Sequence, residues 1–302
     1  MTRKIETKTY EIMDQHISDE QKIALFSDLH YVTYFDKKLI NNIINNIALQ
    51  NPNCICVCGD TIDSTKELEN KKNYDYLLAM FKELGQISET FVSLGSHDFI
   101  KYLKNGRKIG FNEQWLNDLN NLKNVNLLHN SNYEFNKINF IGYTQPWQYY
   151  YSKSVNGKYV DSEEVLIDDL NNYLPSLVKD DKCNILLCHS PIKILEDEVI
   201  NNVDKLKEIR LILSGHMHNG MVPPILDKII KGNKGIIYPE KQLFPKLARG
   251  IYNKNITEEE LISIIISGGI TKIHDCSPKI LHPLNNVFPA SIEYIKVKRK
   301  VI

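Results

Sequence analysis

Five histidines and several carboxylates stand in short groups along this 302-residue chain, each group adjoining a glycine, serine or second acid. Imidazole together with carboxylate suits zinc, iron or manganese, whereas magnesium and calcium prefer oxygen ligands alone. The groups therefore indicate a transition-metal site. In chain order they are Asp28-Leu-His30, Gly59-Asp60-Thr-Ile-Asp63, Gly95-Ser96-His97-Asp98, His189-Ser-Pro and Gly215-His216-Met-His218.

Each group directly follows an apolar run that predicts a buried strand. Open α/β sheets bind ligands just beyond the carboxyl ends of such strands, so we expect the five groups to converge there. Asp28 and His30 are two residues apart, and an extended backbone points both side chains the same way, so they can hold one ion together. The apolar runs are residues 22–27, 54–58, 90–94, 184–188 and 210–214.

The other four histidines have no comparable neighbours, and we expect them on the surface or satisfied within the core. They are His16, His129, His274 and His282.

Helical spacing of apolar residues predicts helices between the strands, and the strand, helix and strand across residues 22–58 form a βαβ unit. Gly85 suits the C-terminal cap of the second helix, and Pro175 is expected to stop the fourth. An edge strand is expected near Tyr10. The remaining predictions are helices at 36–50, 74–84, 115–122 and 163–173, and strands at 125–128, 137–143, 261–267 and 292–297.

Composition limits the classes of protein to consider. The 42% hydrophobic content can fill a substantial core, and we expect one domain over residues 1–302 with two packed sheets. Lys plus Arg equals Asp plus Glu at 37 each, so no global field favours nucleic acid or an anionic membrane. The sequence shows neither a membrane-spanning run nor the apolar core of a signal peptide, which indicates a cytoplasmic protein. It indicates no particular oligomeric state.

Three of the six cysteines alternate along one predicted strand, at Cys54, Cys56 and Cys58. Zinc motifs usually space their thiols as Cys-x-x-Cys around a turn, so a buried apolar strand face is favoured over a zinc site. Reduced cysteines also suit the cytoplasm.

In their order and spacing, the five groups resemble the motifs of the calcineurin-like metallophosphoesterases, from Asp28 to His218. The resemblance implies an α/β fold, a four-layer α/β/β/α sandwich with two packed mixed β-sheets. The proline-rich tail is similar to that of a bacterial branch of small phosphoesterases.

The resemblance also implies a role for each matching residue. Asp60 would bridge two metal ions (Mn, Fe or Zn) about 3.5–4 Å apart that hold a hydroxide, which attacks the phosphoester. His97 would act near the leaving group, with Asp63 orienting it. The remaining matches are Asp28, His30 and His218 as ligands of the first metal, and Ser96, His189 and His216 facing the second.

Ser96 departs from the family, which normally has asparagine at this position. A serine hydroxyl is shorter and a poor ligand, so water would fill the gap or the second ion would bind weakly. Asp98 is a candidate substitute ligand, although the family usually uses that position structurally.

The substrate class implied is a small phosphomonoester or phosphodiester, with a nucleotide or a lipid headgroup as candidates. The alternative function is a catalytically weak, metal-supported protein-interaction module. A nuclease of the same fold is disfavoured, because it would need a basic stripe to bind nucleic acid and the sequence lacks one. Residues 142–162 are a candidate substrate-cap loop or an aromatic loop packed on itself. Residues 221–260 are expected to form an irregular extension, where Lys246 and Arg249 are solvated or meet a second phosphate.

Overall fold

The computed structural model describes residues 3–100, 110–150, 162–237, 243–257, 261–273 and 279–300. Two six-stranded sheets form the centre of the structure. In the part of the chain described, no helix is both long and apolar enough to cross a bilayer.

The first sheet has the strand order β1-β12-β2-β3-β4-β5, so the expected N-terminal edge strand is confirmed. Strands β2 to β5 run parallel, while β12 is antiparallel to β2 and parallel to β1. The bounds are β1 Ile5–Asp14, β2 Gln21–Phe26, β3 Cys54–Cys58, β4 Glu89–Ser93, β5 Val125–Leu127 and β12 Ala290–Arg299.

The second sheet has the order β10-β11-β9-β8-β7-β6. Its inner strands are parallel, and the two edge strands are antiparallel to their neighbours. Both edge strands were missed from the sequence. The bounds are β6 Ser131–Phe135, β7 Ile138–Tyr143, β8 Cys183–Cys188, β9 Ile209–Ser214, β10 Gly250–Asn255 and β11 Leu261–Ile266.

The two sheets pack against each other through a shared apolar core. Strand β3 illustrates the layering, because Cys54, Cys56 and Cys58 face this core while Ile55 and Val57 face the helices. The three cysteines are buried and form no disulfide, which confirms the buried apolar strand face.

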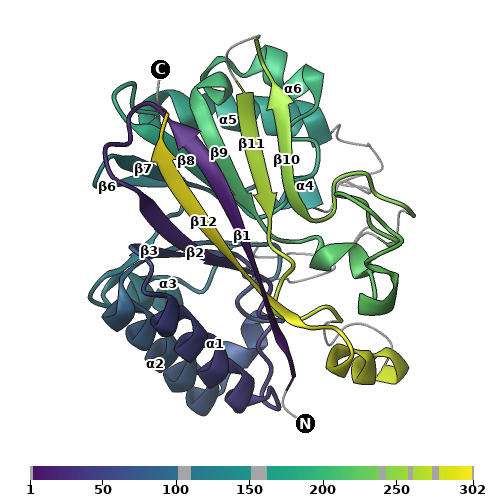
Figure 1. Cartoon of the computed structure of the whole chain (residues 1–302). Helices are drawn as coiled ribbons and strands as arrows, with labels where there is room; N and C mark the ends of the chain where they lie inside the picture. Colours follow the sequence, from purple (N-terminus) through teal and green to yellow (C-terminus); the bar gives the residue numbers. More distant parts are fainter. Residues whose placement is uncertain are drawn as a thin grey trace.

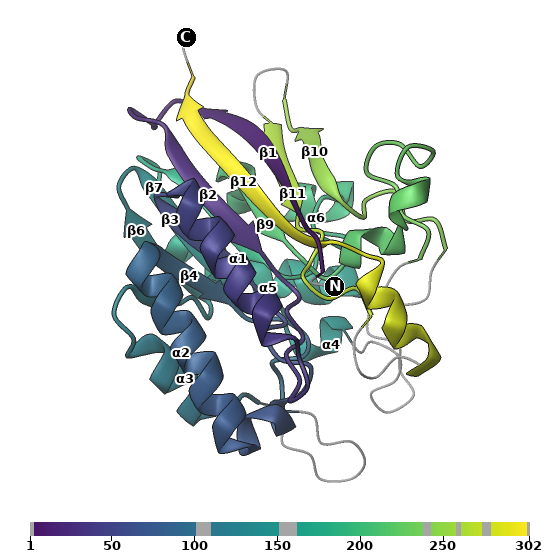
Figure 2. The same ribbon diagram turned by 60° about the horizontal axis from the view of Figure 1, so that its bottom comes forward.

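Helices cover the outer face of each sheet, which confirms the four-layer α/β/β/α sandwich (Figures 1 and 2). Helices α1 to α3 share a core with the first sheet, and α5 and α6 with the second. The helices are α1 Lys37–Gln50, α2 Lys71–Ile87, α3 Glu113–Asn120, α4 Trp147–Tyr150, α5 Ser162–Leu177 and α6 Asp197–Asn202. The 3-10 helices are η1 Thr65–Glu69, η2 Asp204–Glu208, η3 His218–Met221, η4 Pro224–Leu226 and η5 Lys279–Asn286.

Two predicted helix ends were wrong. Helix α2 continues past Gly85, where a Cβ would stand 2.6 Å from the carbonyl of Lys123, so this glycine permits close packing and does not cap the helix. Helix α5 contains Pro175 and ends at Leu177. Pro175 is exposed in the last turn, so water can bond the carbonyl that a proline leaves unpaired there.

Candidate metal centre

All five sequence groups lie in loops that follow strands, three in the first sheet and two in the second. Asp28, Asp60 and His97 follow β2, β3 and β4, whereas His189 and His216 follow β8 and β9. The predicted convergence is therefore seen, and both sheets contribute to it.

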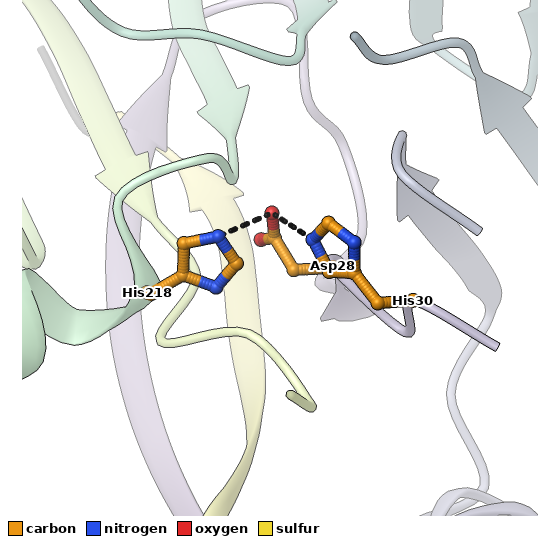
Figure 3. Close-up of side chains that lie close together, drawn as sticks. All are labelled: Asp28, His30 and His218. Atoms are coloured by element: carbon orange, nitrogen blue, oxygen red, sulfur yellow. Dashed lines mark ion pairs between the residues drawn. The ribbon is translucent and has the colours of Figure 1, made fainter. Parts of the chain in front are cut away.

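Asp28, His30 and His218 form the first group of side chains that could hold a metal ion. The Asp28 carboxylate lies between the two rings, with Oδ1 3.9 Å from Nε2 of His30 and 4.0 Å from Nε2 of His218 (Figure 3). All three residues are buried. These separations leave room for an ion between the three donors.

Asp60, His189 and His216 form the second such group, also buried, and a third group joins His30, Asp60 and His97. Nε2 of His189 lies 3.0 Å from Oδ2 of Asp60, and the rings of His189 and His216 are 5.1 Å apart between centroids. Asp60 also reaches the first group, because its Oδ2 is 3.7 Å from Nε2 of His30. One carboxylate thus lies between two sets of histidines.

The histidines are oriented as metal ligands usually are. Nδ1 of His189 lies 2.8 Å from the carbonyl of Cys58, and Nδ1 of His218 lies 2.8 Å from the carbonyl of Thr271. A ring that donates its Nδ1 proton to a carbonyl presents the Nε2 lone pair on its other side. Among the described residues, buried Nε2 of His189 has no aligned hydrogen-bond partner despite its closeness to Asp60. This donor set fits transition-metal ions.

The two central carboxylates are fixed by main-chain amides of other loops. The amide of His216 donates to both oxygens of Asp28 at 3.0 Å, and the amide of His97 donates to Oδ1 of Asp60 at 2.7 Å. Each carboxylate therefore ties its own loop to another loop of the site, and this bonding holds the carboxylates in place.

The backbone at the site is strained. Five of the residues above have positive φ angles, a conformation that is uncommon outside glycine and that persists only where the surroundings impose it. Strain of this kind is concentrated at functional sites, which agrees with the position of this cluster. The residues are Asp28, His30, Asp60, His216 and His218, with φ between 45° and 67°.

Charges within the cluster set its protonation. Burial alone would raise the pKa of Asp60, but His189, His97 and His30 hold it well below its usual range. Burial alone would lower the pKa of His189, yet Asp60 and Asp28 raise it to about 9. The buried carboxylates thus attract positive charge, whether protons on the rings or bound cations.

Ser96 and Asp98 have different contacts around Asp60. The Ser96 hydroxyl donates to Oδ2 of Asp60 at 3.2 Å. Oδ2 of Asp98 accepts from the amides of Gly95 and Asp60, at 2.8 and 3.0 Å. Burial and the nearby Asp60 carboxylate raise the pKa of Asp98 to about 7. Asp98 therefore links the loop after β3 to the loop after β4 through hydrogen bonds to their main chains.

His97 and Asp63 meet in a way that the sequence did not suggest. Nδ1 of His97 lies 2.6 Å from the main-chain carbonyl of Asp63, while the Asp63 carboxylate lies 3.3 Å from Nδ1 of His30. The backbone of Asp63 thus contacts His97, and its carboxylate lies beside His30, a candidate ligand.

The loop after β11 was missed as part of the site. The Thr271 carbonyl bonds His218, and the Thr271 amide donates to the carbonyl of Asp28 at 2.8 Å. The available signal was Ser267-Gly-Gly directly after the apolar run, a further strand end of the kind that marks the other five loops. It carries no ligand-type side chain, so the chemical pattern did not include it.

The other histidines lie as follows. Nδ1 of His16 is 3.0 Å from Asp14, and Nδ1 of His129 is 2.8 Å from the hydroxyl of Thr144, as expected for satisfied residues. His282 lines a cavity, described below, and His274 lies outside the described residues.

Two aromatic side chains of α4 turn inward near the second group. The ring of Tyr150 is 5.7 Å from that of His216 between centroids, and the Tyr149 hydroxyl bonds the carbonyl of Ile192. The start of the candidate cap loop thus borders the site while also packing on its own chain. Residues 151–161 of that loop lie outside the described residues.

Arg249 was expected to be solvated or to meet a second phosphate, and the structure shows neither. It is buried and forms an ion pair with Asp227. Lys246 is exposed, as predicted for a solvated charge. The extension predicted to be irregular over residues 221–260 is irregular only in part, because the edge strand β10, Gly250–Asn255, lies within it. Residues 238–242 and 258–260 lie outside the description.

Comparison with known proteins gives a consistent family assignment. The model of the family described as calcineurin-like phosphoesterase matches residues 21–220. An uncharacterised metallophosphoesterase of Campylobacter jejuni is 24% identical over 233 residues, which cover 77% of this chain and 53% of that protein. One from Helicobacter pylori is 24% identical over 208 residues, or 69% of this chain and 47% of that protein. The chain spans about half the length of these curated relatives.

Solved structures with a similar fold include a dimetal phosphatase from Danio rerio, at 13% identity and a TM-score of 0.42. The match covers 82% of this chain and 87% of that one. A purple acid phosphatase from yellow lupin has 14% identity and a TM-score of 0.45, covering 85% of this chain and 45% of that one. A likeness of this degree says nothing about activity.

Proposed function

Because the chain belongs to the calcineurin-like phosphoesterase family, we propose that it hydrolyses a small phosphomonoester or phosphodiester with two bound transition-metal ions. The matched residues include all five motif groups, and the membership confirms the resemblance read from them. We extend the proposal to one catalytic domain over residues 1–302, acting in the cytoplasm, where the five described free cysteines would stay reduced.

The observation that carries the proposal is the position of the Asp60 carboxylate between two buried sets of histidines. A shared carboxylate can hold two closely spaced ions of the kind used in two-metal hydrolysis. We propose Asp28, His30 and His218 as ligands of one ion and His189 and His216 as ligands of the other, with Asp60 common to both. Ser96 would face the second ion.

Bound manganese, iron or zinc ions would polarise the phosphoryl oxygens and activate the attacking water. The chain itself supplies the negative charge and the fixed geometry that hold such ions. Asp28 and Asp60 are held by main-chain amides, and His189 and His218 by carbonyl groups. Hydrolysis of the phosphoester then needs no side chain of the protein as a covalent nucleophile.

His97 is the proposed proton donor to the leaving-group oxygen. The carbonyl of Asp63 accepts a hydrogen bond from Nδ1 of His97, so Nε2 is the atom that we propose donates a proton to substrate. The ring stands beside His30, with centroids 4.5 Å apart, so it is next to the proposed first ion.

The test is hydrolysis of 4-nitrophenyl phosphate and bis(4-nitrophenyl) phosphate by chelator-stripped protein after manganese is restored. We expect His97→Ala to keep its metal and lose about 10²–10⁴-fold in kcat. Asp60→Asn should lose both metal and activity. His129→Ala removes a histidine that bonds the Thr144 hydroxyl and belongs to none of the described ligand groups, so it serves as the control and should stay active.

Activity that persists in chelator, or in Asp60→Asn, would reject the proposal. If two ions bind and neither ester is hydrolysed, the non-catalytic interaction module becomes the better account, with Ser96 as its support.

A further inference from the structure

A cavity of about 360 Å³ opens beside the first ligand group, and His30 forms part of its wall. Its other walls come from the loop after β2, the start of α1, the loop after β11, η5 and the N-terminal Arg3. In both views the start of β1 lies next to the segment that leads into β12 (Figures 1 and 2). Arg3, just before β1, bonds Phe288, just before β12. The cavity therefore borders the proposed metal centre at His30.

Arg3 is the strongest anion-binding group in the cavity. Its Nε donates to the carbonyl of Phe288 at 2.7 Å, which fixes the guanidinium plane. Its Nη2 is buried and has no hydrogen-bond partner among the described residues. Burial lowers the pKa of Arg3 to about 10, so the group remains a cation at neutral pH. A buried, unsatisfied cationic donor is costly unless a ligand bonds it.

Asp36, the acid in the cavity lining, is used elsewhere. Asp36 caps helix α1, where Oδ1 accepts from the amide of Lys38. Asn285 is used to hold the loop after β11, since its Oδ1 accepts from the amides of Lys272 and Ile273. Among the described residues, Nη2 of Arg3 is thus left for a ligand to bond.

The rest of the lining is mainly apolar, with Val32, Phe35, Leu39 and Ile273. The volume lies at the small end of the range for ligand pockets, which suits a short carbon skeleton and not a polymer. We infer that this cavity binds the part of the substrate remote from the reacting phosphoryl group, and that Arg3 bonds a second anionic group there, a carboxylate or a phosphate. The inference rests on the proposed function.

Binding of non-hydrolysable ligands to the manganese-loaded protein tests it. Titration calorimetry would compare ω-carboxyalkylphosphonates of increasing chain length with alkylphosphonates of matching length. We expect at least one carboxylate to bind about tenfold or more tightly than its alkyl partner, the gain of a charged hydrogen bond. Alkane-α,ω-bisphosphonates of the same lengths show whether a phosphoryl group is preferred to the carboxylate.

In Arg3→Gln, the ratio of the carboxyalkylphosphonate affinity to the alkylphosphonate affinity should fall to about one. Arg210→Gln is the matched control, because Arg210 is also anchored through Nε to a main-chain carbonyl, that of Met13, and does not line the cavity. Its ratio should equal that of the wild type. If Arg3→Gln does not fold, Arg3→Lys keeps the charge without the planar fork and should give a reduced ratio.

The inference is overturned if no chain length shows a preference for the second anion, or if the preference survives in Arg3→Gln. These results differ from failure of the proposed function, in which the alkylphosphonates themselves would not bind and 4-nitrophenyl esters would not be hydrolysed.

Discussion

Ser96 is the residue at which this chain departs from its family pattern, and its hydroxyl bonds the central Asp60. Asparagine would bring a longer side chain with an amide oxygen that can reach a second ion. We predict that Ser96→Asn retains or raises second-site manganese affinity, by up to about tenfold. Metal titration of the two proteins measures this.

Ser64→Asn is the control for that change, because Ser64 caps η1 and asparagine caps equally well. A clear loss of manganese in Ser96→Asn but not in Ser64→Asn would contradict the assignment of Ser96 to the second ion.

His189 gives the metal-free protein a pH-dependent stability. Its pKa is about 9 when folded, because Asp60 and Asp28 outweigh the effect of burial, and 6.5 is the ordinary value. A raised pKa stabilises the fold fully below pH 6.5, and the contribution is lost as pH rises to about 9. We expect chelator-treated protein to lose about 3 kcal/mol of unfolding free energy across this window.

Urea unfolding at pH 6.5 and pH 9 measures that loss, and His189→Gln should remove most of it. Wild-type stability that stays level or rises between these values would show that His189 is not held as a cation by the two carboxylates.

The individual ligand-type residues could be predicted because their chemistry is visible in the sequence. Asp60 and His189 each follow an apolar run, and a strand end is where ligands usually lie. The role of Thr271 could not be predicted, since it acts through main-chain atoms that every residue possesses. The same reason explains why the contact of His97 with the Asp63 carbonyl was not anticipated.

At the scale of elements, the loop after β4 approaches the loop after β3 so closely that only glycine fits. A Cβ on Gly95 would stand 2.3 Å from Oδ1 of Asp60. We predict that Gly95→Ala displaces this carboxylate, destabilises the protein by about 1–3 kcal/mol and weakens manganese binding. Thermal unfolding and metal titration check the two effects.

Gly110→Ala is the matched control, because no described residue lies within 4 Å of a Cβ built there and its φ is not positive. It should change stability by less than about 0.5 kcal/mol. Equal effects in the two variants would show that the close approach at Gly95 is unimportant.

The central strands and the long helices could be predicted from hydrophobic pattern, but the edge strands could not. Strands β6 and β10 lie at the two edges of the second sheet and are largely half-exposed or exposed, so they lack an apolar run. Helix ends were also hard to place. Pro175 lies inside α5 because its position in the exposed last turn makes the lost hydrogen bond inexpensive.

At the scale of the whole molecule, the site depends on the packing of the two sheets against each other, because both sheets contribute loops to it. Phe91 of β4 is fully buried between them and stacks on Phe140 of β7, with centroids 4.2 Å apart. We predict that Phe91→Ala costs about 3–5 kcal/mol, because it leaves a cavity in the shared core. Phe244→Ala, at a side chain that is 72% exposed, should cost less than about 0.5 kcal/mol.

Urea unfolding of both variants measures these costs. A similar small cost for both would mean that the contact between the sheets contributes little to the stability of the fold.

The whole arrangement brings loops from two separate sheets to one carboxylate, and that carboxylate is the point to test. The most direct measurement is anomalous scattering from crystals of the protein soaked with manganese. We predict two peaks, about 3.5–4 Å apart, both within bonding distance of the Asp60 carboxylate, with Asp28 on one side and His189 on the other. A single peak, or peaks that do not share Asp60, would contradict the account.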